Sequence, residues 1–326
     1  MKTLKELFKI GKGPSSSHTM GPQKAAKIFL ENNRGASSFE VTLYGSLAAT
    51  GKGHMTDIAI IEVLEPIAPV RIIWKPAVFL PFHPNGMKFR SFTNDEKPIN
   101  EWTVYSIGGG ALSEGKGDDD MFNSPEVYDM NSMTEIMKWC ERTGRNYWEY
   151  VQLCEDSSLW DYLEVVWIKM KEAVERGLKR EGRLPGPLNL PRKAPTYYVK
   201  ATGYKQSLQT RGLVYAYALA VSEENASGGT IVTAPTCGAC GVLPAVLYHI
   251  SKSHEFTDKQ ILHALATAGL VGNIVKKNAS ISGADVGCQG EVGVACAMAS
   301  AASCQLFGGS PSQIEYAAEM GLEHHL

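Results

Sequence analysis

The stretch VGVACAMASAASCQLFGGSPSQ, residues 292–313, is a long run of sequence without a charged side chain. Its length would permit a membrane-spanning helix. Its composition argues against one, because the small side chains of Ala, Ser, Gly and Cys gain little free energy on transfer to lipid. Inside a protein, the same side chains let neighbouring helices approach closely. The stretch therefore predicts a buried helix in a helical domain and no membrane span.

The sequence before this stretch is also typical of helices. Residues 139–177 keep an amphipathic helical pattern. Thr257 and Gln260 have the spacing of a capping box, which begins a further helix that extends to Val275. We therefore expect residues 126–326 to form an all-α domain.

The N-terminal part of the chain has strand patterns instead. Phe39, Val41 and Leu43 alternate with polar residues, as in a strand with one buried face. Further runs rich in β-branched or aromatic residues lie at 58–63, 70–74 and 102–107. A helical pattern at residues 20–32, with Gly21-Pro22 near its start, precedes the first strand. These elements predict an α+β domain.

Residues 112–125 separate the two parts. They contain the sequence EGKGDDD, which combines glycine with a run of charge and has no apolar period. Such a composition is typical of an exposed linker. The predicted fold class is therefore an α+β N-terminal domain, residues 1–117, followed by an all-α domain, residues 126–326.

Charge and cysteine content limit the partners and the location of the protein. The net charge of -2 provides no basic excess for binding nucleic acid. Charges interrupt every apolar run of the N-terminal sequence MKTLKELFK, which therefore does not resemble a signal peptide. The seven cysteines are an odd number without secretory context, which favours reduced thiols and a cytoplasmic location.

The segment GPSSSHTMGP, residues 13–22, precedes the first predicted helix. Its hydroxyls and its imidazole belong to Ser15, Ser16, Ser17, His18 and Thr19. Together with free N–H groups at a helix N-terminus, the hydroxyls can hold a carboxylate, and His18 adds a proton acceptor or a positive charge. The alternative interpretation is a serine-rich helix cap beside a surface histidine.

The segment YGSLAATGKGHMTD, residues 44–57, leaves a predicted strand and turns through Gly51 and Gly53 before it reaches His54. Glycines there free the backbone to approach a ligand. The spacing of a phosphate-binding loop is absent, so we do not expect a nucleotide site. His54 is a candidate general base because the free imidazole titrates near neutral pH, although a lone histidine in a turn can also be structural.

The segment TAPTCGACGVLPAVL, residues 233–247, contains a Cys-x-x-Cys pair. A strand-like run enters the turn at Cys237 and Cys240, and a helix follows. A redox site of the thioredoxin type has a similar local pattern but normally occurs on alternating strands and helices, which this domain lacks. We interpret the segment as a tightly packed turn, with a redox role as the alternative.

The segment NASISGADVGCQGEVGVACAMA, residues 278–299, has several glycines around Cys288 before a helix of small residues. Glycines leave room for a cysteine sulfur and an attached metal, and a helix N-terminus stabilises a thiolate. Cys296 and Cys304 lie eight residues apart inside the helix, where we interpret them as core residues. One cysteine in a loop cannot hold a cluster alone.

These segments, together with YSIGGG at residues 105–110, resemble in their order the bacterial L-serine dehydratases that depend on an oxygen-sensitive [4Fe-4S] cluster. The resemblance spans nearly the whole chain. It implies an N-terminal α/β domain that binds substrate or allosteric serine, and a helical catalytic domain. It also implies that L-serine is converted to pyruvate and ammonia.

The resemblance further implies which residues hold the cluster. In the family, three cysteines hold it and the fourth iron is open, and by that pattern Cys288 is the first ligand. The other two cysteines follow a Glu-His-His-Leu sequence in the family. Here that sequence, Glu323 to Leu326, ends the chain. The remaining cysteine ligands are therefore expected beyond Leu326, and the helical domain is expected to be incomplete.

The mechanism that the resemblance implies assigns a role to each candidate residue. An open iron would coordinate the hydroxyl of serine, while His54 would remove the α-proton. The residues from Ser15 to Thr19 would bind the substrate carboxylate, and Asn278 and Ser280 would orient the amino group. A homodimer is expected, because it is the commonest oligomeric state of such proteins.

Two alternative functions stay open. A pyridoxal phosphate lyase would run the same net reaction through a lysine Schiff base, for which Lys205 in GYKQS is the nearest candidate. A cluster-free, serine-binding or regulatory subunit would bind L-serine without turnover.

Overall fold

The computed structural model describes residues 1–115, 125–281 and 283–324, without the side chains of residues 283–285, 288 and 289. It contains two compact units. Residues Lys12–Asn123 form the first, here named the sheet unit, and Met1–Gly11 with Ser124–Leu326 form the second, the helical unit. The predicted sequence of an α+β part followed by a helical part is confirmed in this coarse form. The domains 1–117 and 126–326, with their separate functions, stay a prediction.

Five strands form the sheet of the sheet unit, in the spatial order β3-β2-β4-β5-β6. They are β2 (Ser38–Tyr44), β3 (Val70–Lys75), β4 (Gly86–Phe92), β5 (Pro98–Gly108) and β6 (Ala111–Ser113). β2 and β3 are parallel, with Phe39 opposite Val70, and the other neighbouring pairs are antiparallel. A parallel pair cannot be joined by a tight hairpin, so the chain between β2 and β3 must make a crossover.

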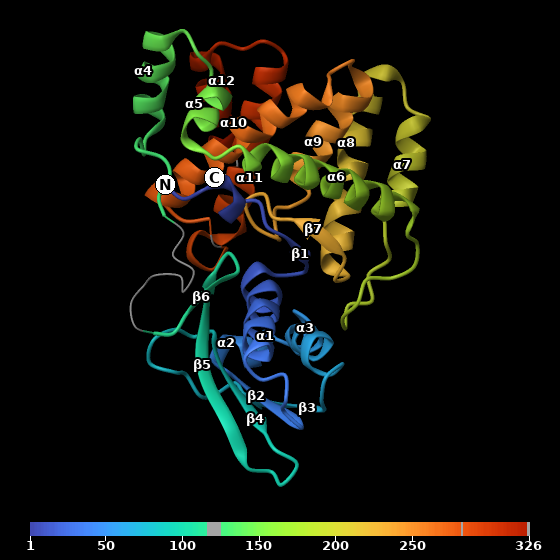
Figure 1. Cartoon of the computed structure of the whole chain (residues 1–326). Coiled ribbons are helices and arrows are strands. Elements are labelled where there is room, and N and C mark those ends of the chain that lie inside the picture. The colour runs from blue at the N-terminus through green and yellow to red at the C-terminus, as the bar shows by residue number, and fades with distance from the viewer. Residues whose placement is uncertain (116–124, 282, 325–326) are drawn as a thin grey trace. The chain divides into compact units, whose positions relative to one another are not determined.

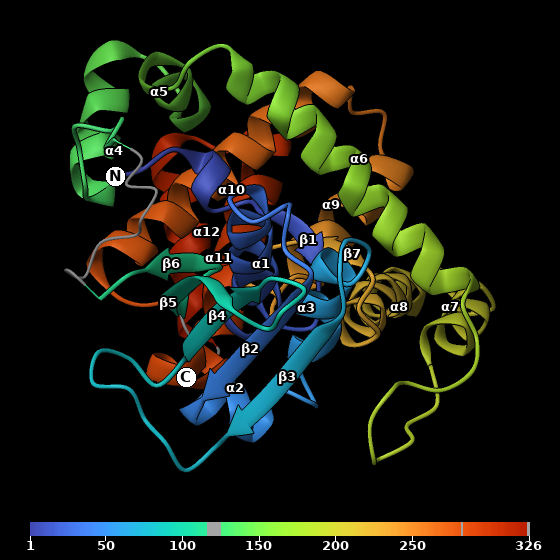
Figure 2. The ribbon, with the colours of Figure 1, turned by 60° about the horizontal axis from the view of Figure 1, so that its bottom comes forward.

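The helical segments of the sheet unit are η2 (Ser16–Met20), a π-helical turn, and α1 (Gly21–Glu31), α2 (Gly45–Thr50) and α3 (Thr56–Leu64). The start of α1, with Pro22 in its first turn, agrees with the prediction. α1 and α3 pack against each other, and α1 lies against β4 and β5 (Figure 2). Phe29 of α1 meets Phe89 and Trp102 of the sheet in the apolar core.

The predicted strand at residues 58–63 is wrong, because these residues lie in α3. Ile58, Ile60 and Ile61 favour a strand by local propensity. In the structure, Ala59, Ile60 and Leu64 are buried on one side of a helix that belongs to the crossover between β2 and β3. The crossover requirement of the parallel pair therefore overrides the local preference.

The helical unit contains nine α-helices over its described residues. They are α4 (Met133–Thr143), α5 (Tyr147–Cys154), α6 (Ser158–Lys179), α7 (Ala194–Thr202), α8 (Gln206–Ala226), α9 (Val242–Ser253), α10 (Asp258–Asn278), α11 (Gly283–Leu306) and α12 (Pro311–Glu323). The capping box of Thr257 and Gln260 at the start of α10 is confirmed. The helical region 139–177 is divided among α4, α5 and α6, because Gly144 adopts a left-handed conformation, with φ of 68°, and ends α4.

The run at residues 292–313 occupies the C-terminal part of α11 and the start of α12. Val294, Ala297 and Ala301 are at most 1% exposed, and α11 packs against α9, α10 and α12 (Figure 1). The predicted buried helix is therefore confirmed up to Leu306, where α11 ends, whereas residues from Phe307 to Gln313 are mostly exposed. Within the described residues, none of the helices combines the length and the apolar character that crossing a membrane requires.

The helical unit also contains one short strand, so the all-α prediction is not met in full. β7 (Thr230–Val232) pairs with β1 (Ile10–Lys12), and the N–H of Thr233 donates to the carbonyl of Lys9 at 2.9 Å. The strand is the run that the sequence analysis placed before the Cys-x-x-Cys turn. The strand forms because β1 provides backbone N–H and C=O groups with which it can pair. β1 follows η1 (Leu4–Glu6) in the N-terminal segment.

The N-terminal segment Met1–Gly11 is buried in the helical unit. Leu4 and Phe8 are fully buried, and both lie over Gly269 of α10, where an added Cβ would come within 2.8 Å of each side chain. The carboxylate of Glu155 accepts hydrogen bonds from the hydroxyl of Thr3 and the N–H of Leu4. The first eleven residues therefore belong with the helices, although the predicted N-terminal domain includes them.

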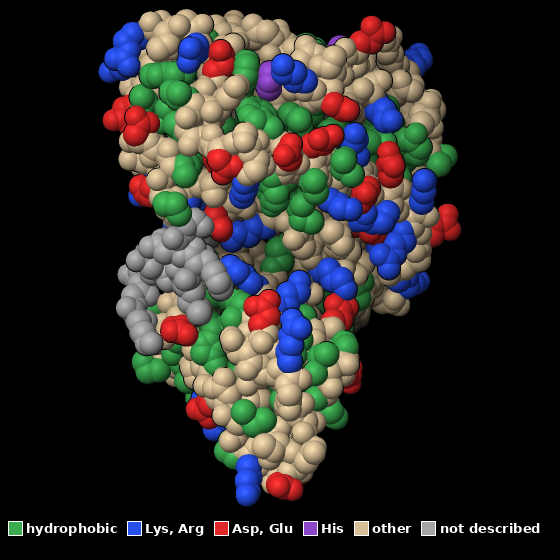
Figure 3. Space-filling view, viewed as in Figure 1, with side chains coloured by type: hydrophobic (Ala, Val, Ile, Leu, Met, Phe, Trp, Pro, Cys, Tyr) green, Lys and Arg blue, Asp and Glu red, His purple; other side chains and the backbone are tan. Residues whose placement is uncertain are grey.

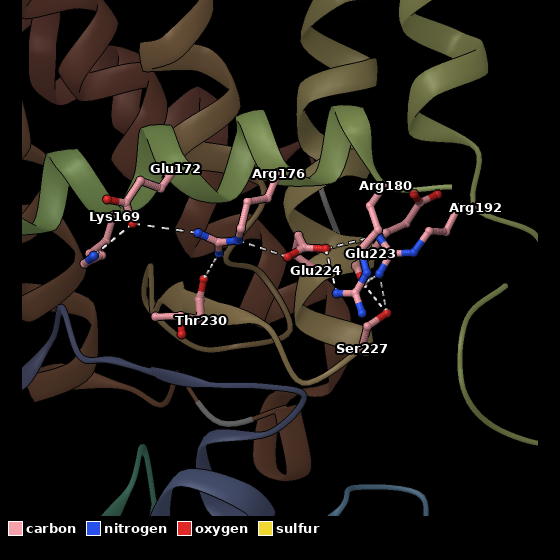
Figure 4. A network of polar contacts seen from close by, with 9 residues as sticks. All are labelled: Lys169, Glu172, Arg176, Arg180, Arg192, Glu223, Glu224, Ser227 and Thr230. Atoms are coloured by element: carbon pink, nitrogen blue, oxygen red, sulfur yellow. Dashed lines mark hydrogen bonds and ion pairs between the residues drawn. The ribbon is translucent and has the colours of Figure 1, made fainter. Parts of the chain in front are cut away.

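Charged side chains of both signs are interspersed on the face of the molecule that Figure 3 shows. The most buried of the ion pairs joins α6, α8 and the segment before α7 (Figure 4). Glu224 is 1% exposed, and its carboxylate accepts hydrogen bonds from Arg176, Arg180 and Arg192 at 3.1–3.2 Å. The Arg192 side chain is 2% exposed and also donates to the hydroxyl of Ser227 at 2.6 Å. Glu224 thus neutralises a guanidinium that has no access to water.

The substitution Glu224→Gln should lower the free energy of unfolding by about 3 kcal/mol, because it leaves the buried guanidinium of Arg192 without a counter-charge. Glu172→Gln, at the exposed end of the same network, is the matched control and should cost less than about 1 kcal/mol. Urea unfolding followed by circular dichroism measures both. Equal losses in the two variants would contradict the role assigned to Glu224.

Candidate active site

The topology of the sheet unit brings the serine-rich segment and the His54 segment together. α1 and β2 follow one another along the chain through a short connection, so the start of α1 lies level with the end of β2. η2 precedes α1, and the α2 segment follows β2 directly. The two segments meet there, with the rings of His18 and His54 4.8 Å apart between centroids. Ligands of open α/β sheets commonly bind at the carboxyl ends of strands.

His18 lies in η2 and makes hydrogen bonds through both ring nitrogens. Nδ1 is 2.9 Å from the hydroxyl oxygen of Ser17, and Nε2 is 3.0 Å from that of Ser46. Burial, and then repulsion from His54, lowers the pKa of His18 to about 4, while a hydrogen bond with Ser46 opposes the shift. His18 is therefore neutral near physiological pH. The positive charge considered for it in the sequence analysis is absent there.

His54 lies in the turn between α2 and α3. Its Nδ1 is 3.1 Å from the backbone carbonyl oxygen of Thr50. A carbonyl can only accept, so this contact requires a proton on Nδ1, and the neutral ring then carries its lone pair on Nε2. The next residue, Met55, adopts a left-handed conformation with φ of 55°. The turn thus presents an imidazole whose tautomer is set by the backbone.

The hydroxyls of the serine-rich segment divide into two groups. The hydroxyl of Ser15 caps η2 by accepting the N–H of His18, and Thr19 donates its hydroxyl to the carbonyl of His54 at 2.7 Å. Ser16 is buried, at 9% exposure. Ser17 is half-buried and contacts His18. Ser15 therefore acts as the helix cap that the alternative interpretation expected. The side chains of Ser17 and His18 lie instead at the contact between the two histidines.

Two residues near the histidines were not singled out from the sequence. Ser46 lies inside the YGSLAATGKGHMTD segment, where its hydroxyl was a signal that the sequence offered. His83, which repels a protonated His18, accepts the N–H of Asn85 at 3.1 Å. It lies in the sequence FHPNG, which matches no catalytic pattern. Its place near His18 depends on the segment between β3 and β4.

The remaining candidate residues lie in the helical unit. Asn278 ends α10, and its amide nitrogen donates to the carbonyls of Asn131 and Ile274 at 2.7 and 2.9 Å. Ser280 lies two residues further on. The Cys288 side chain is outside the described residues. The role of these residues toward an amino group or a cluster stays a prediction.

The Cys-x-x-Cys turn packs beside α11. Cys237 and Cys240 are buried, and burial raises the pKa of each thiol, to about 12 for Cys240. Glu291 of α11 accepts the hydroxyl of Thr236, and an added Cβ at Gly238 would lie 2.7 Å from the Glu291 carboxylate. Thiols with raised pKa values are poor nucleophiles. These contacts favour the tightly packed turn over the redox site.

The described residues do not form a metal centre by themselves. Over the described parts of the chain, His, Cys, Asp and Glu nowhere gather in a group of three that could hold a metal ion. A cluster with an open iron needs three protein thiolates. The described side chains do not supply such a set by themselves, and the Cys288 side chain lies outside them.

Comparison with known proteins identifies the family. Residues 45–326 match the family described as serine dehydratase alpha chain, and residues 3–73 match serine dehydratase beta chain. L-serine dehydratase 1 of Escherichia coli (strain K12) is 40% identical over 100% of this chain and 83% of its own length. The L-serine dehydratases of Haemophilus influenzae and Streptomyces coelicolor are 37% and 36% identical over 100% and 98% of this chain, and 83% and 82% of their own lengths. This chain belongs to the serine dehydratase family.

Proposed function

We propose that this protein is an L-serine dehydratase, which eliminates water from L-serine to give pyruvate and ammonia. Family membership over the whole chain supports the reaction. The observation that carries the assignment of the site is the contact between His18 and His54 at the end of β2. The contact joins two segments that are separated in the sequence. The ring nitrogens of His18 contact the hydroxyls of Ser17 and Ser46, and Nδ1 of His54 contacts the carbonyl of Thr50.

His54 serves as the base in this proposal. Elimination requires the removal of the weakly acidic α-proton of serine, and a neutral imidazole can accept it. The carbonyl of Thr50 holds the Nδ1 proton, so Nε2 is the accepting atom. The β-hydroxyl takes up a proton as it leaves, so the proton lost from Cα and the hydroxyl lost from Cβ together make up the one water that is eliminated. The released aminoacrylate hydrolyses to pyruvate and ammonia.

The serine-rich segment serves as the carboxylate site in this proposal. Its hydroxyls are Ser15, Ser16, Ser17 and Thr19, and His18 lies among them. Since His18 is neutral, it contributes hydrogen bonds rather than charge. Ser17 and His18 are the side chains at the histidine contact, so they are the direct ligands of the carboxylate, and Ser15 and Thr19 hold the segment in shape.

The rest of the proposal concerns the helical unit and the assembly. Asn278 and Ser280 orient the substrate amino group, for which the Asn278 amide oxygen is a suitable acceptor. A [4Fe-4S] cluster with Cys288 as one ligand is supported by the family and by the glycine-rich sequence around Cys288. The protein acts in the cytoplasm as a homodimer, which light scattering on the purified protein tests.

Replacement of His54 tests the base. His54→Ala should lower kcat for pyruvate formation from L-serine by about 10²- to 10⁴-fold, the usual contribution of a positioned base. His249→Ala, at a half-buried histidine of α9, is the control and should keep kcat near that of the parent chain. A His54→Ala variant with normal fold and less than a tenfold loss would remove His54 from this role.

The lowered pKa of His18 predicts how stability depends on pH. Between its ordinary pKa of 6.5 and about 4, the unfolded chain binds a proton that the folded chain does not. The free energy of unfolding therefore falls as the pH falls through this window. His18→Asn should lose less stability than the parent chain between about pH 7 and about pH 4.5, as measured by urea unfolding. The idea fails if both chains lose the same amount.

Removal of the Cys288 thiol tests the cluster. After anaerobic reconstitution of the full-length protein, Cys288→Ser should retain less iron and acid-labile sulfide than the parent protein, because a thiolate ligand is lost. Cys140→Ser, at a buried cysteine of α4, is the control. Equal iron in both variants would overturn the assignment of Cys288. A parent chain that binds L-serine calorimetrically without iron or turnover would favour the cluster-free, serine-binding subunit.

A further inference from the structure

Two buried threonines connect the histidine segments by reciprocal hydrogen bonds. Thr19, next to His18, donates its hydroxyl to the backbone carbonyl of His54 at 2.7 Å. Thr56, two residues after His54, donates its hydroxyl to the backbone carbonyl of His18 at 2.6 Å. Each threonine thus holds the histidine of the opposite segment. Both bonds link a side chain of one segment to the backbone of the other.

Both threonines are buried, which makes the loss of either hydrogen bond costly. Thr19 is 2% exposed and Thr56 is fully buried. Water cannot replace a hydroxyl at such positions, so its loss would leave a histidine carbonyl without its partner. A displaced carbonyl also moves the Cα of its own residue and therefore the imidazole. Loss of either hydroxyl should consequently change the position of the imidazole rings.

The backbone of the His54 turn makes hydrogen bonds of its own, and the Thr56 hydroxyl takes no part in them. Thr56 begins α3, and its N–H donates to the carbonyl of Gly51 at 2.9 Å. Met55, before it, is left-handed, and no side chain caps the helix start. The Thr56 hydroxyl therefore serves the neighbouring segment instead of its own helix.

We propose that Thr19 and Thr56 are positioning residues that hold the imidazoles of His18 and His54 in contact. Their effect on turnover rests on the proposed function, whereas their effect on the ring contact does not. Without either hydroxyl, the two segments separate and the imidazole of His54 leaves its place beside that of His18. Even a shift of about 1 Å in a catalytic group can lower a rate by about 100-fold.

The titration of His18 reports the contact without any need for turnover. The charged or titratable groups that act on His18 are His54 and His83, and burial acts in the same direction. Separation of the segments weakens the repulsion from His54 and admits water. Both changes raise the pKa of His18 from about 4 toward 6.5.

The experiment compares Thr56→Val and Thr19→Val with Thr56→Ser and Thr19→Ser in the full chain. Valine has the shape of threonine without the hydroxyl, and serine keeps the hydroxyl. We expect the His18 pKa, measured by NMR on histidine-labelled protein, to rise by more than one unit in the valine variants. The serine variants should stay near the parent value. Thr42→Val, at a buried position of β2 away from the histidines, is the matched control and should change nothing.

The proposal is overturned if both valine variants fold and keep the parent His18 pKa and the His18–His54 ring contact. If one valine variant does not fold, the other tests the same pair. In an active preparation, the valine variants should lose about 100-fold in kcat and the serine variants should recover most of it. If the parent chain shows no serine turnover, the proposed function fails, while the NMR result still decides the role of the threonines.

Discussion

The parallel pairing of β2 and β3 is the constraint on which the candidate site depends. Because the two strands run in the same direction, the chain must cross from the end of β2 back to the start of β3. The crossover is built from α2, the His54 turn and α3. It therefore begins at the end of β2, level with the start of α1, where η2 carries His18. An antiparallel pair would need no crossover and would leave no His54 turn at this edge.

Burial then determines what the two histidines can do. His18 makes contact with Ser17 and Ser46 and is neutral because its surroundings disfavour a charge. The tautomer of His54 follows from its contact with a carbonyl. Two imidazoles of the same intrinsic chemistry thus differ in their surroundings, because one contacts hydroxyls and the other a backbone carbonyl. Differences of this kind commonly separate acid and base roles in active sites.

The helical unit depends on the close approach of its helices and on a buried network of charged side chains around Glu224. Gly177 of α6 lies against the backbone of Ala220 in α8, where a Cβ would have no space. Glu224 lies one turn further along α8, and it gathers guanidiniums from α6 and from the segment before α7. Gly269 of α10 likewise leaves space for the side chains of Leu4 and Phe8 of the N-terminal segment. Helices that approach this closely leave little room for substitution, since overpacking displaces backbone.

The sequence by itself determined the features that depend on local chemistry. The buried helix at residues 292–306, the capping box at Thr257 and the start of α1 at Gly21-Pro22 follow from the amino acids that occupy those positions. So do the two segments that carry His18 and His54, and the family that they indicate. Only the tertiary structure decided that residues 58–63 form a helix, that Met1–Gly11 joins the helical unit, and that Ser15 and Thr19 hold the backbone. The physical reason is that periodicity and capping act within a few residues, whereas strand direction, burial and hydrogen-bond partners depend on residues that are distant in the sequence.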